Sequence, residues 1–131
     1  MNQVKTVMII DDDEDDRQLF FDAVSEIDKS IRCFGASNGE EALRLLNGET
    51  ITLPDFIFLD LNMPRLNGKR FLAQIKKVQA LCHIPVVIYS TSRRAEDVEE
   101  TKKLGAAYFL TKPALFDEIG KSIARVLKGN W

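Results

Sequence analysis

Polar residues that could do chemistry follow directly on short apolar runs of the chain. They are Asp11 and Asp12 after 7–10, Asp60 after 56–59, Ser90 after 86–89, and Lys112 shortly after 107–110. Three carboxylates at close range repel one another and need a cation, and oxygen-only ligands select a hard ion such as Mg²⁺. A lysine and a hydroxyl beside that ion can each take an oxygen of a phosphoryl group. The set is therefore typical of phosphoryl transfer, in which catalysis is mostly positioning and charge neutralisation.

The apolar runs predict the strands that position these residues. They are continuous rather than alternating and are rich in β-branched and aromatic residues. This pattern is typical of strands buried on both faces, as in a parallel sheet covered by helices. Residues 30–36 predict a weaker strand, because Arg32 interrupts the run, and an edge position suits such a strand.

Between the strands the apolar period becomes that of a helix. Three stripes predict buried helical faces: Leu19, Phe20, Ala23, Val24 and Ile27; Phe71, Leu72, Ile75 and Val78; and Phe116, Ile119, Ile123 and Val126. Residues 40–46 predict a short helix. Residues 94–104 predict a weakly held one, with Val98 and Leu104 as its firm apolar anchors.

This alternation predicts an α/β fold, a doubly wound five-stranded parallel sheet with five helices. The expected topology is flavodoxin-like, with strand order 2-1-3-4-5. In such sheets ligands bind at the carboxyl ends of the strands. The acidic residues, Ser90 and Lys112 should therefore converge at one edge.

Length and composition exclude several other classes of protein. The chain has 131 residues, which is one domain, and a net charge of −2, which argues against a nucleic-acid binder held by broad electrostatics. Its longest apolar runs are too short for a membrane span. His83 is the only histidine, so a histidine-rich metal site is excluded. Cys33 and Cys82 are expected to be small core residues, and free thiols fit a cytoplasmic protein.

The sequence resembles a known family, the receiver domains of two-component response regulators, of the single-domain type seen in chemotaxis. The resemblance rests on residues 9–12, 59–64 with Asn67 and Gly68, 84–90, and 105–113, and it covers the chain from the first strand to the last helix. It implies one receiver domain over residues 1–131, with no output domain and no DNA binding.

The resemblance also implies roles for individual residues. Asp60 would accept a phosphoryl group from a histidine kinase or a phosphotransfer protein. Asp11, Asp12 and Asp60 would bind Mg²⁺ together with the backbone carbonyl of Asn62. Ser90 and Lys112 would each bind an oxygen of the phosphoryl group; the serine replaces a more frequent threonine.

Further implied roles concern switching and lifetime. Phe109 would turn inward when Ser90 moves, which would remodel a surface for an unknown downstream protein or a homodimer. Phe109 lacks the hydroxyl of the tyrosine that is frequent at this position. Asn62, Thr91 and Ser92 would tune how fast the acyl phosphate hydrolyses.

Two alternatives stay open beside a signalling adaptor or a phosphorelay link. One is a receiver-like interaction module that is never phosphorylated. The other is a phosphatase of the haloacid dehalogenase type, which also uses an aspartyl phosphate. Those enzymes need a second aspartate two residues after the nucleophile as general acid and base, and this chain has Asn62 there.

Overall fold

Strands and helices alternate along the chain in the computed structural model, which describes residues 3–48, 52–63 and 67–129. In chain order the elements are β1 (Thr6–Ile10), α1 (Glu14–Ile27), β2 (Arg32–Ala36), α2 (Gly39–Asn47), β3 (Phe56–Leu59), α3 (Gly68–Ile75), β4 (Val86–Ser90), α4 (Ala95–Lys103), β5 (Tyr108–Thr111) and α5 (Phe116–Leu127). Pro64, which is part of one family motif, lies outside the described residues.

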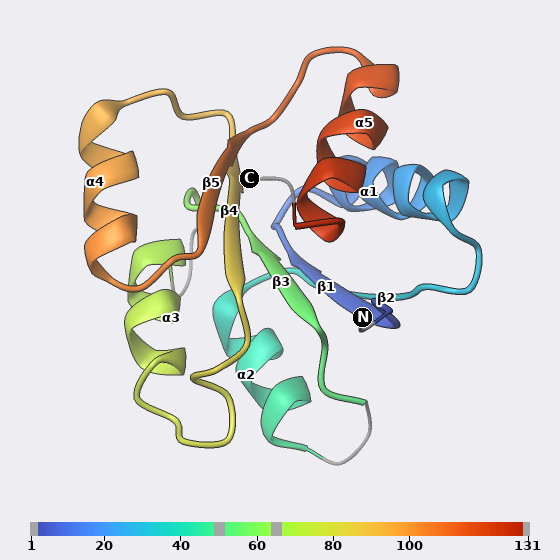
Figure 1. The fold of residues 1–131 in the computed structure, drawn as a ribbon. Coiled ribbons are helices and arrows are strands. Elements are labelled where there is room, and N and C mark those ends of the chain that lie inside the picture. Colours follow the sequence, from blue (N-terminus) through green and yellow to red (C-terminus); the bar gives the residue numbers. More distant parts are fainter. Residues whose placement is uncertain (1–2, 49–51, 64–66, 130–131) are drawn as a thin grey trace.

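The strands form one parallel sheet in the order β2-β1-β3-β4-β5. Helices α1 and α5 cover one face, and α2, α3 and α4 cover the other (Figure 1). All of β1 and β4 is buried, whereas β2 at the edge buries only Ala36. The predicted flavodoxin-like fold and strand order are confirmed.

Each face of the sheet has its own hydrophobic core. On the α1 and α5 face, the ring centroid of Phe20 lies 4.9 Å from that of Phe58 and 5.9 Å from that of Tyr89. Such aromatic pairs add about 0.5–1.5 kcal/mol each to the burial of apolar area. On the other face, Phe71 and Ile75 of α3 are fully buried. These contacts fix α1 and α3, which both begin beside the polar edge of the sheet.

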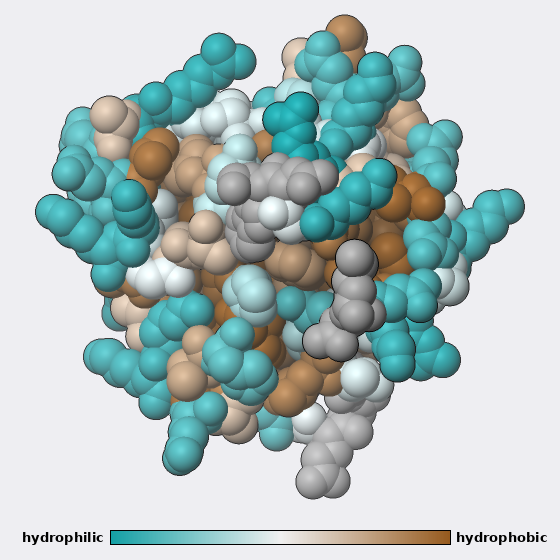
Figure 2. Space-filling model, in the orientation of Figure 1, coloured by the Kyte–Doolittle hydropathy of each residue, from teal (hydrophilic) through white to brown (hydrophobic). Residues whose placement is uncertain are grey.

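Helix α4 is held differently. It has one buried residue, Thr101, whereas each of the other helices has three or four. The Thr101 hydroxyl donates a hydrogen bond of 2.7 Å to the carbonyl of Asp97. The prediction that Val98 anchors this helix is wrong, because its side chain is 41% exposed. Hydrophilic side chains cover the α4 side of the molecule (Figure 2).

Three other expectations need correction. Leu19 is 39% exposed, because it lies at the margin of the α1 face that buries Phe20 and Ala23. Val78 lies in the turn after α3 and is half-buried. Cys82 is exposed because it lies in the loop before β4, whereas Cys33 packs half-buried against the α1 and α5 core. Burial raises the pKa of the Cys33 thiol to about 11.

Candidate phosphoryl-transfer site

The ladder hydrogen bonds of the sheet continue one residue past the strands and thereby place the candidate residues. The Asp11 amide donates to Ala36 at 3.0 Å, and the Asp60 amide donates to Ile10 at 2.9 Å. On the other side, the Lys112 amide donates to Ser90 at 2.8 Å. These residues therefore lie at one edge of the sheet with their backbones fixed.

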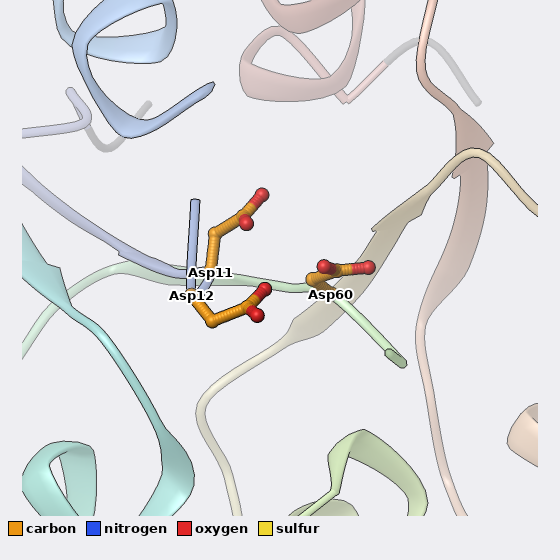
Figure 3. Close-up of side chains that lie close together, drawn as sticks. All are labelled: Asp11, Asp12 and Asp60. Carbon is orange, nitrogen blue, oxygen red and sulfur yellow. The ribbon is translucent and has the colours of Figure 1, made fainter. Parts of the chain in front are cut away.

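Three carboxylates meet at this edge. One oxygen of each of Asp11, Asp12 and Asp60 lies within 4.8 Å of the others. Figure 3 shows the side chains of Asp11 and Asp12 beside each other, with Asp60 across from them. Asp11 and Asp60 are buried, whereas Asp12 is exposed and lines an open cleft together with Asn62, Lys69 and other residues. The predicted convergence of the acids is confirmed geometrically.

Asp60 has an unusual electrostatic environment. Burial raises the pKa of its carboxyl group to about 6; nearby Lys112 opposes this shift, and Asp11 and Asp12 reinforce it. One carboxylate oxygen accepts a long hydrogen bond of 3.4 Å from the amide of Asn62. A carboxylate in this setting gains from any cation that shares its negative charge.

Lys112 supplies a cation to the cluster. Its ammonium lies 2.6 Å from a carboxylate oxygen of Asp11, 2.9 Å from one of Asp16 and 3.9 Å from one of Asp60. It also lies 5.5 Å from the ring centroid of Tyr89. Burial disfavours the charged ammonium, but the hydrogen bonds to Asp11 and Asp16 outweigh it, so the pKa of Lys112 lies above its usual value. Lys112 is therefore a fixed positive charge at the site.

Ser90 is the last residue of β4 and is fully buried. Its hydroxyl oxygen accepts a hydrogen bond of 3.3 Å from the amide of Ser92. The Ser92 hydroxyl in turn donates to the carboxylate of Asp97 on α4. Thr91, between the two serines, is exposed. A polar chain thus connects Ser90 to α4.

Phe109, the predicted switch residue, lies in β5. It is half-buried and packs against the core on the α2 and α3 side of the sheet. With Val98, Thr101 and Ala106 it lines a small hollow between α4 and β5. The side chain therefore has open space beside it.

Two contributors were missed by sequence reasoning. Asp16 is not singled out by the sequence, where it is one of six consecutive acids, yet its carboxylate pairs with the Lys112 ammonium. Gly68 begins α3, and a Cβ there would lie 2.5 Å from the carbonyl oxygen of Asp60. The Asn67-Gly68 motif was visible in the sequence, but the close approach of α3 to β3 that requires glycine was not.

The donor set fits a hard divalent cation. Only carboxylate oxygens make up the cluster, two of the three carboxylates are buried, and the raised pKa of Asp60 reflects burial and repulsion between neighbouring acids. Oxygen ligands of this kind suit Mg²⁺ or Mn²⁺ rather than softer ions.

Among the helices of the described residues, none combines the length and the apolar composition that a membrane-spanning helix needs.

Comparison with known proteins identifies the family. Residues 7–124 match the model of the response regulator receiver domain. The chain belongs to this family. Its receiver fold is similar to the crystal structure of the phosphorylated cyanobacterial phytochrome response regulator RcpA, with a TM-score of 0.85 and 29% identity over 98% of this chain and 94% of that one.

Two other relatives bear on the chemistry of the receiver domain. Response regulator Rcp1 of Synechocystis sp. is 29% identical over 93% of this chain and 86% of its own length. Its structure has been solved in a Mn²⁺-bound form, which covers 93% of this chain and 91% of that one with a TM-score of 0.82. Sporulation initiation phosphotransferase F of Bacillus subtilis is 28% identical over 92% of each chain. Receiver domains bind a divalent metal at an acidic pocket and are phosphorylated by histidine kinases or phosphotransfer proteins.

Proposed function

We propose that this receiver domain takes a phosphoryl group onto Asp60 from a histidine kinase or phosphotransfer protein, in a reaction that requires Mg²⁺. The observation that carries the proposal is the placement of Lys112, which lies 3.9 Å from Asp60 and beside a cluster of three carboxylates. A degenerate module that only binds partners has no need of this complete set.

The reaction is a simple displacement. A carboxylate oxygen of Asp60 attacks the phosphorus of a phosphohistidine, and an acyl phosphate O–P bond forms as the P–N bond breaks. The electron pair goes to the departing imidazole nitrogen, which takes up a proton. Lys112 and the Ser90 hydroxyl each bind an oxygen of the transferred group and so fix its orientation.

Asp11, Asp12, Asp60 and the backbone carbonyl of Asn62 would hold the metal. Bound there, Mg²⁺ supplies charge neutralisation for the phosphoryl oxygens and for the crowded carboxylates. Without a cation, the negative charges of Asp11 and Asp12 oppose the approach of a phosphoryl group to Asp60. The Mn²⁺-bound form of Rcp1 supports the binding of a divalent cation by this receiver domain.

Phosphorylation of Asp60 changes the conformation of α4 and β5. When the Ser90 hydroxyl turns toward the phosphoryl group, Phe109 turns inward into the space beside it, and the surface of α4, β5 and α5 changes. The weak apolar anchoring of α4 supports this, because a helix with one buried residue moves at low cost. The changed surface binds a downstream protein or a second copy of this chain, or the group passes on along a phosphorelay, as the name of phosphotransferase F suggests for that relative.

Three residues around the site set the lifetime of the acyl phosphate. Asn62, which lines the cleft, and Thr91 are exposed, and Ser92 is half-buried. We assign them control over the access of water to the phosphorylated Asp60.

Intact mass of the protein after incubation with acetyl phosphate tests the proposal. One added phosphoryl group is expected with Mg²⁺, none with a chelator, and none in Asp60→Asn. Asp15→Asn is the matched control, because Asp15 is an exposed acid outside the cluster. Beryllofluoride binding covers the case in which hydrolysis is faster than detection. Absence of both the adduct and beryllofluoride binding would favour an interaction module that works without phosphorylation, and continuous release of phosphate from phosphate esters would favour a phosphatase.

A further inference from the structure

Lys112 is shared between the acidic cluster and helix α1. Its ammonium lies 2.6 Å from Asp11, which belongs to the cluster, and 2.9 Å from Asp16, which does not. The side chain of Lys112 is only 10% exposed, whereas that of Asp16 is 35% exposed. Asp16 thus reaches from the helix to the lysine at the rim of the site.

The backbone around Asp16 is fixed from two sides. Asp13 caps the helix, and its carboxylate accepts hydrogen bonds from the amides of Asp15 and Asp16. One turn further, the guanidinium of Arg17 donates a hydrogen bond of 2.8 Å to the carbonyl of Asp11. The first turn of α1 is therefore tied to the end of β1, and the Asp16 carboxylate is held beside Lys112.

A helix-start charge alone does not explain Asp16. Glu14, Asp15 and Asp16 all lie in the first turn, where negative charge interacts favourably with the helix dipole. In the described residues, the ammonium of Lys112 pairs with the carboxylate of Asp16 and with neither of the other two. Asp15 and Asp16 thus carry the same charge in the same helical turn, but only Asp16 contacts Lys112.

We propose that Asp16 is a positioning residue that keeps the Lys112 ammonium beside Asp60 while the acidic cluster is occupied. The proposal deepens the proposed function and rests on it. A divalent cation held by Asp11 would repel the Lys112 ammonium. It would also neutralise much of the negative charge of Asp11 and so weaken the ion pair between Asp11 and Lys112. Asp16 lies outside the ligand set, so its carboxylate remains a full partner for Lys112.

Without that partner the ammonium has only the carboxylates of Asp11 and Asp60, both of which it would share with the metal. It then moves toward solvent, and the phosphoryl group loses one of its two side-chain partners. Asp16 itself makes and breaks no bond and moves no proton in the reaction. Its effect passes entirely through the position of Lys112.

The test compares Asp16→Asn with Asp15→Asn, which removes the same charge from the same helical turn. At saturating Mg²⁺, Asp16→Asn should slow modification by acetyl phosphate about threefold to tenfold, as expected for loss of a partly exposed ion pair, and Asp15→Asn should stay within about twofold of wild type. Asp16→Glu, which keeps the charge, should recover part of the rate. Equal rates for Asp16→Asn and Asp15→Asn would overturn the proposal.

A second readout follows the lysine itself rather than the reaction. In protein with ¹⁵N-labelled lysine, the ammonium protons of Lys112 should exchange with water faster in Asp16→Asn than in wild type or Asp15→Asn, both in chelator and with Mg²⁺. Unchanged exchange with Mg²⁺ would contradict a positioning role. If wild type takes no phosphoryl group at all, the proposed function fails, and the ammonium exchange still decides whether Asp16 holds Lys112.

Discussion

Gly68 approaches the backbone of Asp60 so closely that a Cβ at Gly68 would lie 2.5 Å from the Asp60 carbonyl oxygen and 2.7 Å from the Cα of Leu61. The amide of Gly68 also donates a hydrogen bond of 3.2 Å to the carbonyl of Leu61. Helix α3 therefore begins directly on the segment that carries the candidate phosphoacceptor.

We expect Gly68→Ala to lower the free energy of unfolding by about 1–3 kcal/mol, because backbone atoms must shift to admit the methyl group. It should also slow phosphorylation, because the shift displaces Asp60. Gly120→Ala is the matched control: it lies in α5 with nothing within 4 Å of a Cβ, and it should raise stability by about 0.5–1 kcal/mol. Urea denaturation measures both. A Gly68→Ala protein as stable as wild type would contradict the close contact.

The raised pKa of Asp60 makes stability depend on pH. The folded protein holds the Asp60 proton up to a pKa of about 6, against 3.8 as the usual value, so this carboxyl stabilises the fold below about pH 4 and loses that contribution as the pH rises through 6. In chelator at pH 8, Asp60→Asn should therefore raise the free energy of unfolding by about 1–3 kcal/mol.

Denaturation of the metal-free proteins at pH 4.5 and pH 8 checks this difference. It should shrink toward the lower pH, where the carboxyl of wild type is itself protonated in the folded state. A gain in stability that is the same at both values would show that the pKa of Asp60 is not raised by its surroundings.

Removal of the Lys112 charge should expose the competition between the ammonium and a metal. In chelator, Lys112→Met leaves the buried carboxylate of Asp11 without its 2.6 Å partner and should lower the free energy of unfolding by about 1–4 kcal/mol. Because a competing cation is gone, the affinity for Mg²⁺ measured by calorimetry should rise, while beryllofluoride binding weakens. Lys121→Met on the exposed side of α5 is the control. A fall in Mg²⁺ affinity would mean that Lys112 supports the metal instead of competing with it.

Lys69 of α3 joins α4 through ion pairs of 2.8 Å with Asp97 and 2.7 Å with Glu100. Because α4 has little apolar anchoring, Lys69→Met should make the amides of Ala95–Lys103 exchange with solvent about twofold to fivefold faster, as expected for loss of exposed ion pairs. Hydrogen exchange followed by mass spectrometry measures this, with α1 as the internal reference. Unchanged exchange in α4 would show that these pairs do not hold the helix.

The sequence predicts the sheet well because its central strands are short, continuous apolar runs rich in β-branched and aromatic residues, which are typical of strands buried on both faces. It also predicts which acids converge, since parallel strands end at the same edge. The prediction fails where a particular side-chain contact determines which residue is buried. Thr101 rather than Val98 is buried in α4, because the Thr101 hydroxyl finds a backbone acceptor within its own helix.

The ion pair between Asp16 and Lys112 could not be predicted from the sequence either. The two residues are 96 positions apart, and no local pattern connects them. Asp16 stands in a run of acids whose charges look alike in the sequence, and only the three-dimensional path of α1 singles it out.

The register of the sheet has a consequence for how this molecule tolerates change. Ile10 pairs with Leu59, and Asp11 and Asp60 each follow directly on one member of that pair. Their spacing is thus set across the strands and not along the chain. Insertions in the connections at the opposite edge, such as residues 76–85 between α3 and β4, should leave the geometry of the acids intact. Deletion of a single residue within β1 would invert the side chains and send Asp11 to the other face. The connections at the edge opposite the site can therefore vary in length, whereas the length of the strands that lead to Asp11 and Asp60 is constrained.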